Sequence, residues 1–409
     1  MTKKSDAPAI RFKGFSDAWE QRKLTEFVEF FSGLTYTPND VQENGTLVLR
    51  SSNVSNGEVV DADNVYVNPQ VVNSENVKVG DIVVVVRNGS RSLIGKHAQI
   101  KAFMPNTVIG AFMTGIRSEC PEFTNALLNT SRFEEEIAMN MGATINQITG
   151  YMFSKMEFKV PCLDEQKKIG EYFEKLDRLV TLHQRKFEKL TNVKKSMLEK
   201  MFPQNGSSYP EIRFKGFTDP WEQRKLEDYL TVSTEKNTGN IYGRSDVLSV
   251  SGDYGIVNQI EFQGRSFAGA SVLNYGVVQA GDVVYTKSPL NSNPYGIIKT
   301  NKGKPGIVST LYAVYHPKEN TFSDFIQVYF EQHARMNNYM HPLVNKGAKN
   351  DMKVSAENAL KGPVCFPSRV EQESISAFFS VLDDLITLHQ RELEKLQNIK
   401  KSMLEKMFV

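Results

Sequence analysis

Two stretches of the chain share one pattern of apolar positions. In residues 165–202, and again in residues 371–408, apolar side chains recur at alternating spacings of four and three. That period is typical of a coiled-coil seam, so each stretch is predicted to form a long helix. Neither stretch contains proline, and a helix of about 38 residues would extend roughly 57 Å. The predicted seam positions, with the two histidines as packing residues, are Ile169, Phe173, Leu176, Val180, His183, Phe187, Leu190, Ile375, Phe379, Leu382, Ile386, His389, Leu393 and Leu396.

The two helical stretches are copies of one another, and a second copied motif precedes each half of the chain. TLHQR and KKSMLEKMF are identical in both stretches, and residues 8–24 recur at 210–226 with three differences. The chain is therefore two tandem halves related by a pseudo-two-fold repeat. Two near-identical apolar stripes in one chain favour an intramolecular antiparallel pair. Pro203 ends the first helix and opens a linker.

Between the copied parts the two halves diverge. Residues 25–160 and 227–366 share little beyond a strand that follows a Gly-Asp turn, at Gly80 and at Gly281. Short strands bounded by Gly, Asn and Ser turns predict mixed α/β (α+β) domains. The predicted limits are a first domain at 1–162, a helix at 163–202, a linker at 203–209, a second domain at 210–368 and a helix at 369–409.

Polar loops follow the predicted strands in both variable domains. They combine basic, amide and hydroxyl side chains with a flexible backbone, and these are the residue types that pair with base edges in DNA. Solvated turns are the alternative interpretation for many of these residues taken singly, so the prediction depends on their grouping. The candidates are Arg50, Ser51, Asn53, Arg87, Asn88, Ser90, Arg91, Asn146, Gln147, Lys287, Ser288, Asn291, Asn293, Tyr295, Lys346, Lys349 and Asn350.

Charge and cysteine content limit where a DNA-binding surface could lie and in which cell compartment the protein would function. The 49 basic residues nearly balance 47 acidic ones, for a net charge of +2. A DNA-binding surface must therefore be local, or shared with a more basic partner. The cysteines Cys120, Cys162 and Cys365 have no CxxC spacing, which predicts a reduced, cytoplasmic location. The apolar runs are too short to span a membrane, and no secretory signal is expected.

Three segments of the chain resemble catalytic motifs, but none of them completes its motif. Residues 89–97 resemble a phosphate-binding loop, but five residues separate the glycines and His97 replaces the Mg²⁺-binding hydroxyl. Asn293-Pro294-Tyr295 lacks the second proline of the amino-methyltransferase signature. Glu157-Phe158-Lys159 could end a nuclease motif, but no convincing partner aspartate precedes it. No catalytic residue, metal site or cofactor site is therefore predicted in this chain.

Taken together, the layout resembles the specificity subunit of type I restriction–modification systems, in versions from Gram-positive bacteria. The resemblance covers essentially the whole chain and rests on the repeated IRFKGF and WEQRKL motifs and on TLHQR and KSMLEKMF in both helices. It implies two target-recognition domains, each reading one half of a split DNA target. It implies that the helices form an antiparallel coiled-coil spacer and dock two methyltransferase subunits, which restriction/translocase subunits join. S-adenosylmethionine, ATP and Mg²⁺ would then belong to those partners.

The resemblance also extends the set of candidate DNA-contacting residues. In the family, recognition domains commonly use the loop after the first strand and the loop after the Gly-Asp strand. Those loops correspond here to Tyr36 with Arg50–Asn53, then Arg87–Lys96, and in the second domain to Ser251–Tyr254 and Lys287–Tyr295. The residues added are Tyr36, Lys96, Ser251, Asp253 and Tyr254.

Two alternatives remain open at this level. The chain could be the targeting subunit of a fused enzyme in which one partner both cuts and methylates. It could instead be a coiled-coil adaptor that binds proteins and never DNA, although this leaves the divergence of two polar-loop domains unexplained.

Overall fold

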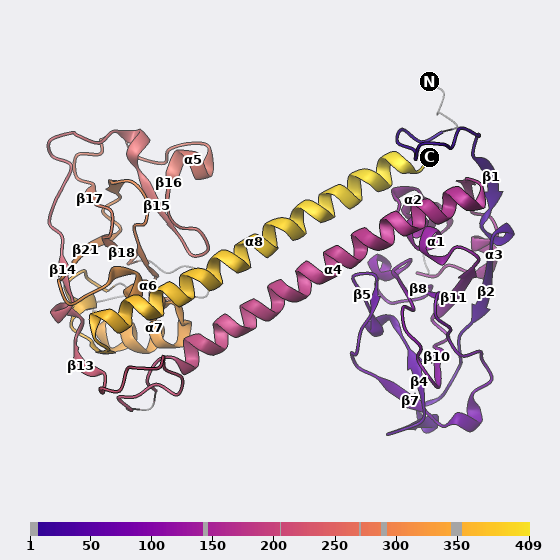
Figure 1. The fold of residues 1–409 in the computed structure, drawn as a ribbon, viewed down its shortest axis with the longest axis horizontal. Coiled ribbons are helices and arrows are strands. Elements are labelled where there is room, and N and C mark those ends of the chain that lie inside the picture. Colours follow the sequence, from indigo (N-terminus) through magenta and orange to yellow (C-terminus); the bar gives the residue numbers. More distant parts are fainter. Residues whose placement is uncertain (1–6, 142–145, 205, 270, 288–292, 345–353) are drawn as a thin grey trace. The chain divides into compact units, whose positions relative to one another are not determined.

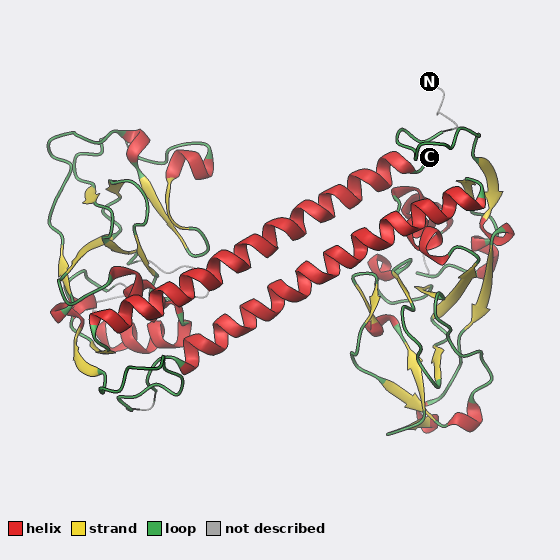
Figure 2. Cartoon of the chain, in the orientation of Figure 1, coloured by secondary structure: helices red, strands yellow, loops and turns green. Residues whose placement is uncertain are grey.

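The computed structural model describes residues 7–141, 146–204, 206–269, 271–287, 293–344 and 354–409. The chain forms two compact units, which we call unit 1 (Met1–Gln184 with Arg391–Val409) and unit 2 (Arg185–Gln390). The two long helices predicted from the sequence are present as α4 (Leu163–Lys200) and α8 (Arg369–Met407), and each contributes to both units (Figure 1). The predicted mixture of helix and sheet is confirmed (Figure 2). Among the described residues, no helix is long and apolar enough to cross a membrane.

Unit 1 is built on a four-stranded antiparallel sheet with the order β2-β11-β8-β9. These strands are β2 (Val28–Ser32), β11 (Met113–Ser118), β8 (Ile82–Val85) and β9 (His97–Gln99). A second sheet, ordered β10-β4-β7-β3, comprises β10 (Thr107–Ile109), β4 (Thr46–Leu49), β7 (Val65–Val67) and β3 (Val41–Gln42). The remaining elements are β1 (Glu20–Lys23) paired with β12 (Glu157–Val160), β5 (Val54–Ser55) paired with β6 (Glu58–Val59), and helices α1 (Pro121–Leu128), α2 (Ser131–Asn140) and α3 (Gly150–Phe153).

Unit 2 repeats the central sheet and differs around it. The order β14-β21-β18-β19 matches that of unit 1, with β14 (Leu230–Val232), β21 (Ala313–Pro317), β18 (Val283–Tyr285) and β19 (Ile298–Thr300). Three two-stranded pairings surround it. They are β13 (Glu222–Lys225) with β22 (Pro363–Phe366), β15 (Leu248–Ser251) with β16 (Gly255–Asn258), and β17 (Gly276–Val278) with β20 (Gly306–Val308). The helices are α5 (Gln259–Gln263), α6 (Ser323–Glu331) and α7 (His333–Met340).

The shared Gly-Asp turn is a buried structural device that starts the central strand of each unit. Gly80 and Gly281 adopt left-handed φ angles of 94° and 88°, which a side chain would strain. The buried Asp81 carboxylate accepts two hydrogen bonds of 2.9 Å from Arg117. At the equivalent place, His316 Nδ1 lies 2.7 Å from the buried Asp282 carboxylate. The motif is therefore common to both domains because it builds the sheet.

The two long helices pack against each other in opposite directions within each unit. In unit 1 the ring centroids of Phe173 and Phe408 are 5.9 Å apart, and Asp177 pairs with Lys400 at 2.6 Å. In unit 2 the corresponding contacts are Phe202 with Phe379 at 6.2 Å and Lys194 with Asp383 at 2.5 Å. Residue numbers fall along α8 as they rise along α4, so the pairing is antiparallel. Every predicted seam residue is buried or half-buried.

The copied segment at 8–24 and 210–226 locks the end of one long helix onto the start of the other. In unit 1, Ile10 N donates a hydrogen bond to the carbonyl of Lys406 and Arg11 forms a bidentate ion pair with the fully buried Glu165. Trp19 meets Phe408 edge to face at 6.1 Å.

Unit 2 contains the same lock in its own copy of the segment. Ile212 N donates to the carbonyl of Lys200, Arg213 forms a bidentate pair with Glu371, and Trp221 meets Phe202 at 5.9 Å. These contacts explain why this segment is copied together with the helices. We call the segment the clamp.

We predict that Arg213→Ala lowers the free energy of unfolding by about 3 kcal/mol, because it leaves the buried Glu371 carboxylate unpaired. Urea unfolding followed by tryptophan fluorescence in a Trp19→Phe background, where Trp221 reports on unit 2, measures the loss. Arg224→Ala is the matched control, since its pair with Glu222 is exposed and is worth about 1 kcal/mol or less. Equal losses of unfolding free energy for the two variants would contradict the stabilising role given to the Arg213–Glu371 ion pair of the clamp.

Candidate nucleic-acid interface

In unit 1 the loop that follows β8 gathers polar residues from three separate parts of the chain. The side-chain amide of Asn88 donates to Ser51 Oγ at 3.1 Å, and the Asn88 backbone N–H donates to the Asn146 carbonyl at 3.4 Å. Asn146 returns a side-chain hydrogen bond to the Gly89 carbonyl at 3.0 Å. Arg87 and Gln147 form an isolated β-bridge. Five of the residues proposed from sequence, Ser51, Arg87, Asn88, Asn146 and Gln147, therefore share one surface.

The cationic and aromatic residues on this surface include some that sequence reasoning missed. The Arg87 guanidinium lies 5.0 Å from the ring centroid of Phe112, whose side chain is 55% exposed. Lys155 lies at the same distance from the ring of the exposed Tyr151 on α3. A cation over an exposed ring suits contact with both phosphate and base. None of Phe112, Tyr151 and Lys155 stands in a polar turn of the sequence. The Phe112 carbonyl accepts backbone hydrogen bonds from Val86 and Arg87, which places its ring at the β8 loop, whereas Tyr151 and Lys155 form a separate contact at α3.

Three candidates of the first domain make contacts within the domain, and for the buried Asn53 the prediction of base contact is corrected. Asn53 is 1% exposed, and its amide nitrogen donates to the Ala62 carbonyl and to Asn64 Oδ1. Arg50 is held by the carboxylate and carbonyl of Asp63. Tyr36 packs against a small apolar cluster. A polar turn next to a strand end favoured Asn53, but its burial gives it a structural role.

The other predicted residues of the β8 loop are Ser90, Arg91 and Lys96, and they follow Asn88 along the chain. Arg91 is exposed at the start of a short turn of helix, and Lys96 is half-buried. The Ser90 backbone N–H donates a hydrogen bond to Asn88 Oδ1, and the Ser90 hydroxyl lies 2.9 Å from Ser92 Oγ. Ser90 therefore shapes the loop that carries Asn88.

In unit 2 the equivalent loop presents Lys287. Lys287 has a left-handed φ of 52°, and its ammonium donates to the Thr310 carbonyl at 3.0 Å. Burial lowers the pKa of Lys287, and the neighbouring charge of Lys236 lowers it further. Leu311 lies directly beyond Thr310 and is exposed. Unit 2 therefore has the ammonium group of Lys287 and the aliphatic side chain of Leu311 at this loop, whereas unit 1 has the guanidinium of Arg87 and the ring of Phe112.

Two further candidates in this loop are engaged within the domain. Asn293 Oδ1 lies 2.5 Å from His333 Nδ1, and the Tyr295 carbonyl accepts a 2.7 Å hydrogen bond from Tyr285. Ser251, Asp253 and Tyr254 form the tip of the β15–β16 hairpin, where the exposed Tyr254 ring packs on Phe262 at 5.2 Å. The remaining candidates, Ser288, Asn291, Lys346, Lys349 and Asn350, lie outside the described residues.

The rejected catalytic motifs occupy structural positions. His97 is buried in β9 with Nδ1 3.0 Å from the Gly95 carbonyl, and burial lowers its pKa. Glu157 lies in β12 and accepts a hydrogen bond from Gln21. Within the described part of the chain, no group of three or more His, Cys, Asp or Glu residues could hold a metal ion.

Each unit has its own four-stranded sheet of the same strand order, and in each a central strand ends in a polar loop. The two units differ around these sheets and are joined by duplicated helices, which is the organisation of a two-domain recognition protein. Residues 16–192 match the family model described as the type I restriction modification DNA specificity domain. The chain is 22% identical over 418 residues to the EcoKI specificity subunit of Escherichia coli K12, covering 96% of this chain and 89% of that protein.

Other comparisons agree. The StySPI specificity subunit of Salmonella potsdam is 28% identical over 40% of this chain and 36% of its own length. The crystal structure of the type I restriction–modification S subunit from M. genitalium superposes with a TM-score of 0.64 at 13% identity, covering 98% of this chain and 99% of the other, so the two share a fold. The chain is similar to the specificity subunits of type I restriction–modification systems.

We predict that Asn53→Ala lowers the free energy of unfolding by about 1–3 kcal/mol, since it leaves the Ala62 carbonyl and the Arg50 N–H without their side-chain partner. Arg87→Ala changes that free energy by about 0.5 kcal/mol or less, because Arg87 is exposed. Urea unfolding of both variants makes the comparison. A larger loss for Arg87→Ala would reverse the assignment of structural and surface roles.

Proposed function

We propose that the two domains read the two halves of a bipartite DNA target, unit 1 through the β8 loop surface and unit 2 through the loop at Lys287. The observation that carries this proposal is the pair of loops at equivalent strand ends, alike in scaffold and different in chemistry. The two sheets have the same strand order, so both loops are held in the same way. The loop with Arg87 and Asn88 then faces one half-site, and the loop with Lys287 faces the other. Different side chains on one scaffold then recognise different bases.

The chemistry of the β8 loop surface supports direct reading of bases. A guanidinium can pair with both acceptors of guanine, and the amide of Gln147 can pair with adenine. Phe112 could contact a thymine methyl group beside the Arg87 contact. Such contacts need only a local patch of positive charge, which fits a chain whose net charge is +2.

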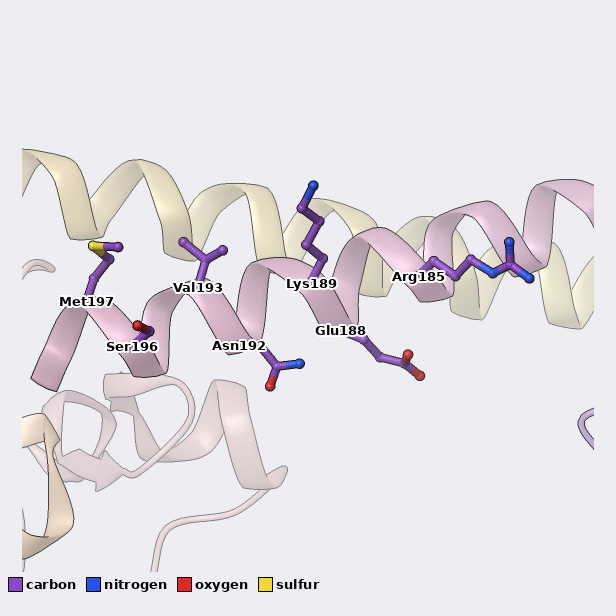
Figure 3. A pocket seen from close by; sticks show the side chains of 7 residues that line it. All are labelled: Arg185, Glu188, Lys189, Asn192, Val193, Ser196 and Met197. Carbon is purple, nitrogen blue, oxygen red and sulfur yellow. The ribbon is translucent and has the colours of Figure 1, made fainter. Parts of the chain in front are cut away.

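Docking of two methyltransferase subunits is proposed on the copied halves of the helices. In unit 2 an open groove of about 530 Å³ runs along one face of α4, where Lys189, Val193 and Met197 project from the same side (Figure 3). Six of its seven lining residues are identical at the equivalent positions of α8, and Val193 is replaced by Ile399. The lining residues are Arg185, Glu188, Lys189, Asn192, Val193, Ser196 and Met197, matched by Arg391, Glu394, Lys395, Asn398, Ile399, Ser402 and Met403.

Two copies of one surface suit two copies of one partner. The exposure pattern along the two sets is the same residue by residue, so a subunit that binds one set finds matching side chains at the other. Methyl transfer, DNA translocation and cleavage would then be carried out by the methyltransferase and restriction subunits, with S-adenosylmethionine, ATP and Mg²⁺ bound there. In this proposal the chain itself determines which DNA sequence the complex binds.

Each recognition surface should control one half-site only. In the complex reconstituted with the methyltransferase subunit, Arg87→Ala and Lys287→Ala should each weaken binding to the target by about 1–3 kcal/mol if the residue contacts a base. Fluorescence anisotropy at physiological salt, on duplexes altered in one half-site at a time, measures the effect. The target is taken from the modified bases of the source genome.

The control is Arg224→Ala, an exposed arginine of the clamp that should leave binding unchanged. For Arg87→Ala, discrimination should vanish at one half of the target and persist at the other. If the unaltered complex binds target and random duplexes equally, specific reading of DNA is wrong for this chain.

The helices should set the gap between the half-sites. Inserting one heptad after Gln184 and one after Gln390 keeps the seam in phase and lengthens each helix by about 10 Å. The preferred gap should then grow by about three base pairs, at about 3.4 Å each. Sequencing of methylated bases made by the variant complex gives the new gap. Methylation at the original gap would refute the spacer.

A further inference from the structure

Unit 1 contains a cavity where the clamp meets the start of α4. Its volume is about 470 Å³, and all of its lining residues belong to unit 1. This volume is within the usual range of ligand-binding sites. None of the lining residues belongs to the β8 loop surface. The lining includes Glu26, Phe27, Glu119, Cys120, Leu163 and Gln166.

The cavity lies beside a chain connection that is shorter in unit 1 than in unit 2. Only two residues, Glu119 and Cys120, stand between β11 and α1, whereas the five residues 318–322 join β21 to α6. Each connection leaves the strand that pairs with the central β8 or β18 and then enters a helix, so the two are equivalent. Unit 2 therefore has three more residues at this place than unit 1.

In unit 2 the longer loop packs onto the clamp and the start of α8. The backbone N–H of Lys318 donates a 2.9 Å hydrogen bond to the Tyr229 carbonyl. The side-chain amide of Gln372 holds the loop through both of its ends. Its oxygen accepts from the Phe322 backbone N–H at 2.9 Å, and its nitrogen donates to the Asn320 carbonyl at 3.2 Å. A glutamine side chain thus binds a peptide backbone here.

The counterparts of these two contact residues line the cavity of unit 1. Phe27 and Gln166 stand where unit 2 has Tyr229 and Gln372. Gln166 retains the one hydrogen bond that both glutamines make to a proline carbonyl, here from Nε2 to Pro161 at 2.9 Å. Among the residues that the structure describes, it makes neither of the bonds by which Gln372 holds the loop. Its amide therefore offers an acceptor and a donor to another peptide backbone.

The charges around the cavity favour a basic ligand. Asp17, Glu26 and Glu119 line it, and within the described ranges none of the three forms an ion pair. The two arginines of the lining are each paired with a glutamate. At the place of Glu119 the unit 2 loop begins with Lys318, whose ammonium donates to the Glu227 carbonyl at 2.6 Å. The cavity thus has free carboxylates where the filled site of unit 2 has an ammonium group.

We propose that this cavity binds an extended, lysine-bearing segment of a partner protein, one segment per chain. The backbone of the segment pairs with the Gln166 amide, its ammonium group lies at Glu119, and an apolar side chain packs on Phe27 and Leu163. The loop 318–322 shows the mode of binding, because it makes these backbone contacts in unit 2. Since that loop occupies the place in unit 2, only unit 1 can bind a partner in this way. The inference does not depend on how the chain reads DNA.

Binding of a synthetic peptide to the full chain tests the site. The probe is His-Pro-Lys-Glu-Asn-Thr-Phe-Ser, the sequence of residues 316–323, with a fluorophore at its N-terminus. Fluorescence anisotropy follows its binding, and we expect saturation at one peptide per chain. The same peptide with glutamate in place of its lysine should bind about tenfold more weakly, because it sets a like charge against Glu119.

Two variants of the chain test where the peptide binds. Replacing Glu119 and Cys120 by Lys-Glu-Asn-Thr-Phe gives unit 1 the loop of unit 2, which should fill the cavity and abolish binding of the peptide. Glu26→Gln with Glu119→Gln should weaken binding about tenfold, because two exposed ionic contacts are lost. Glu29→Gln is the matched control, since this exposed carboxylate of β2 lies outside the lining and should leave binding unchanged.

Circular dichroism and thermal melting check that each variant is folded. Should the chain with the longer loop fail to fold, Cys162→Trp obstructs the cavity from an exposed residue of its lining. Absence of peptide binding to the native chain would overturn the proposal. Binding that persists unchanged in the obstructed chain and in the carboxylate variant would do the same, because the peptide would then be held elsewhere.

Discussion

Antiparallel packing of α4 on α8 is the constraint on which each unit depends. The core of unit 1 includes Ile169 and Phe173 of α4 together with Met407 at the end of α8 and Phe408 just beyond it. The core of unit 2 includes Leu198 of α4 and Phe202 just beyond its end, together with Ile375 and Phe379 of α8. Neither domain has a complete core without a helix end from the other half of the sequence. The helices therefore do more than connect the domains, because each domain is finished by them.

The clamp explains how the copied sequence maintains this packing. Arg11 and Arg213 reach buried carboxylates at the start of a long helix, and Trp19 and Trp221 cover the phenylalanine at the end of the other helix. Since the same three kinds of contact recur, the residues that make them are copied, whereas residues in the β8 and Lys287 loops are free to differ. Sequence constancy here follows helix packing, and sequence divergence follows the surfaces proposed to meet DNA.

Periodicity in the sequence predicted both long helices and their antiparallel pairing, because a seam of apolar residues has no other stable partner within the chain. The grouping of polar residues in turns predicted that Arg87, Asn88, Asn146 and Gln147 belong to one kind of surface. It could not separate Asn53 from them, since a buried amide that satisfies backbone groups looks the same in sequence as an exposed one.

Buried charges in the packing were equally hidden from sequence reasoning. Arg335 stacks on Phe202 and Tyr329 and donates a hydrogen bond to the Leu198 carbonyl near the end of α4. Burial lowers the pKa of Arg335 to about 10. An arginine between Ala334 and Met336 on a short helix gives no hint of that role, because the aromatic residues around it come from distant parts of the chain.

The division of each long helix between the units has a consequence for the order of events at the ribosome. All residues of unit 2 lie between Arg185 and Gln390, so its core is complete once that stretch has emerged. Unit 1 needs Met407 and Phe408, so the domain translated first is the last to close its core. Domains of a growing chain usually fold in the order in which they are made. In this chain the N-terminal domain keeps part of its core incomplete until Met407 and Phe408 have been made.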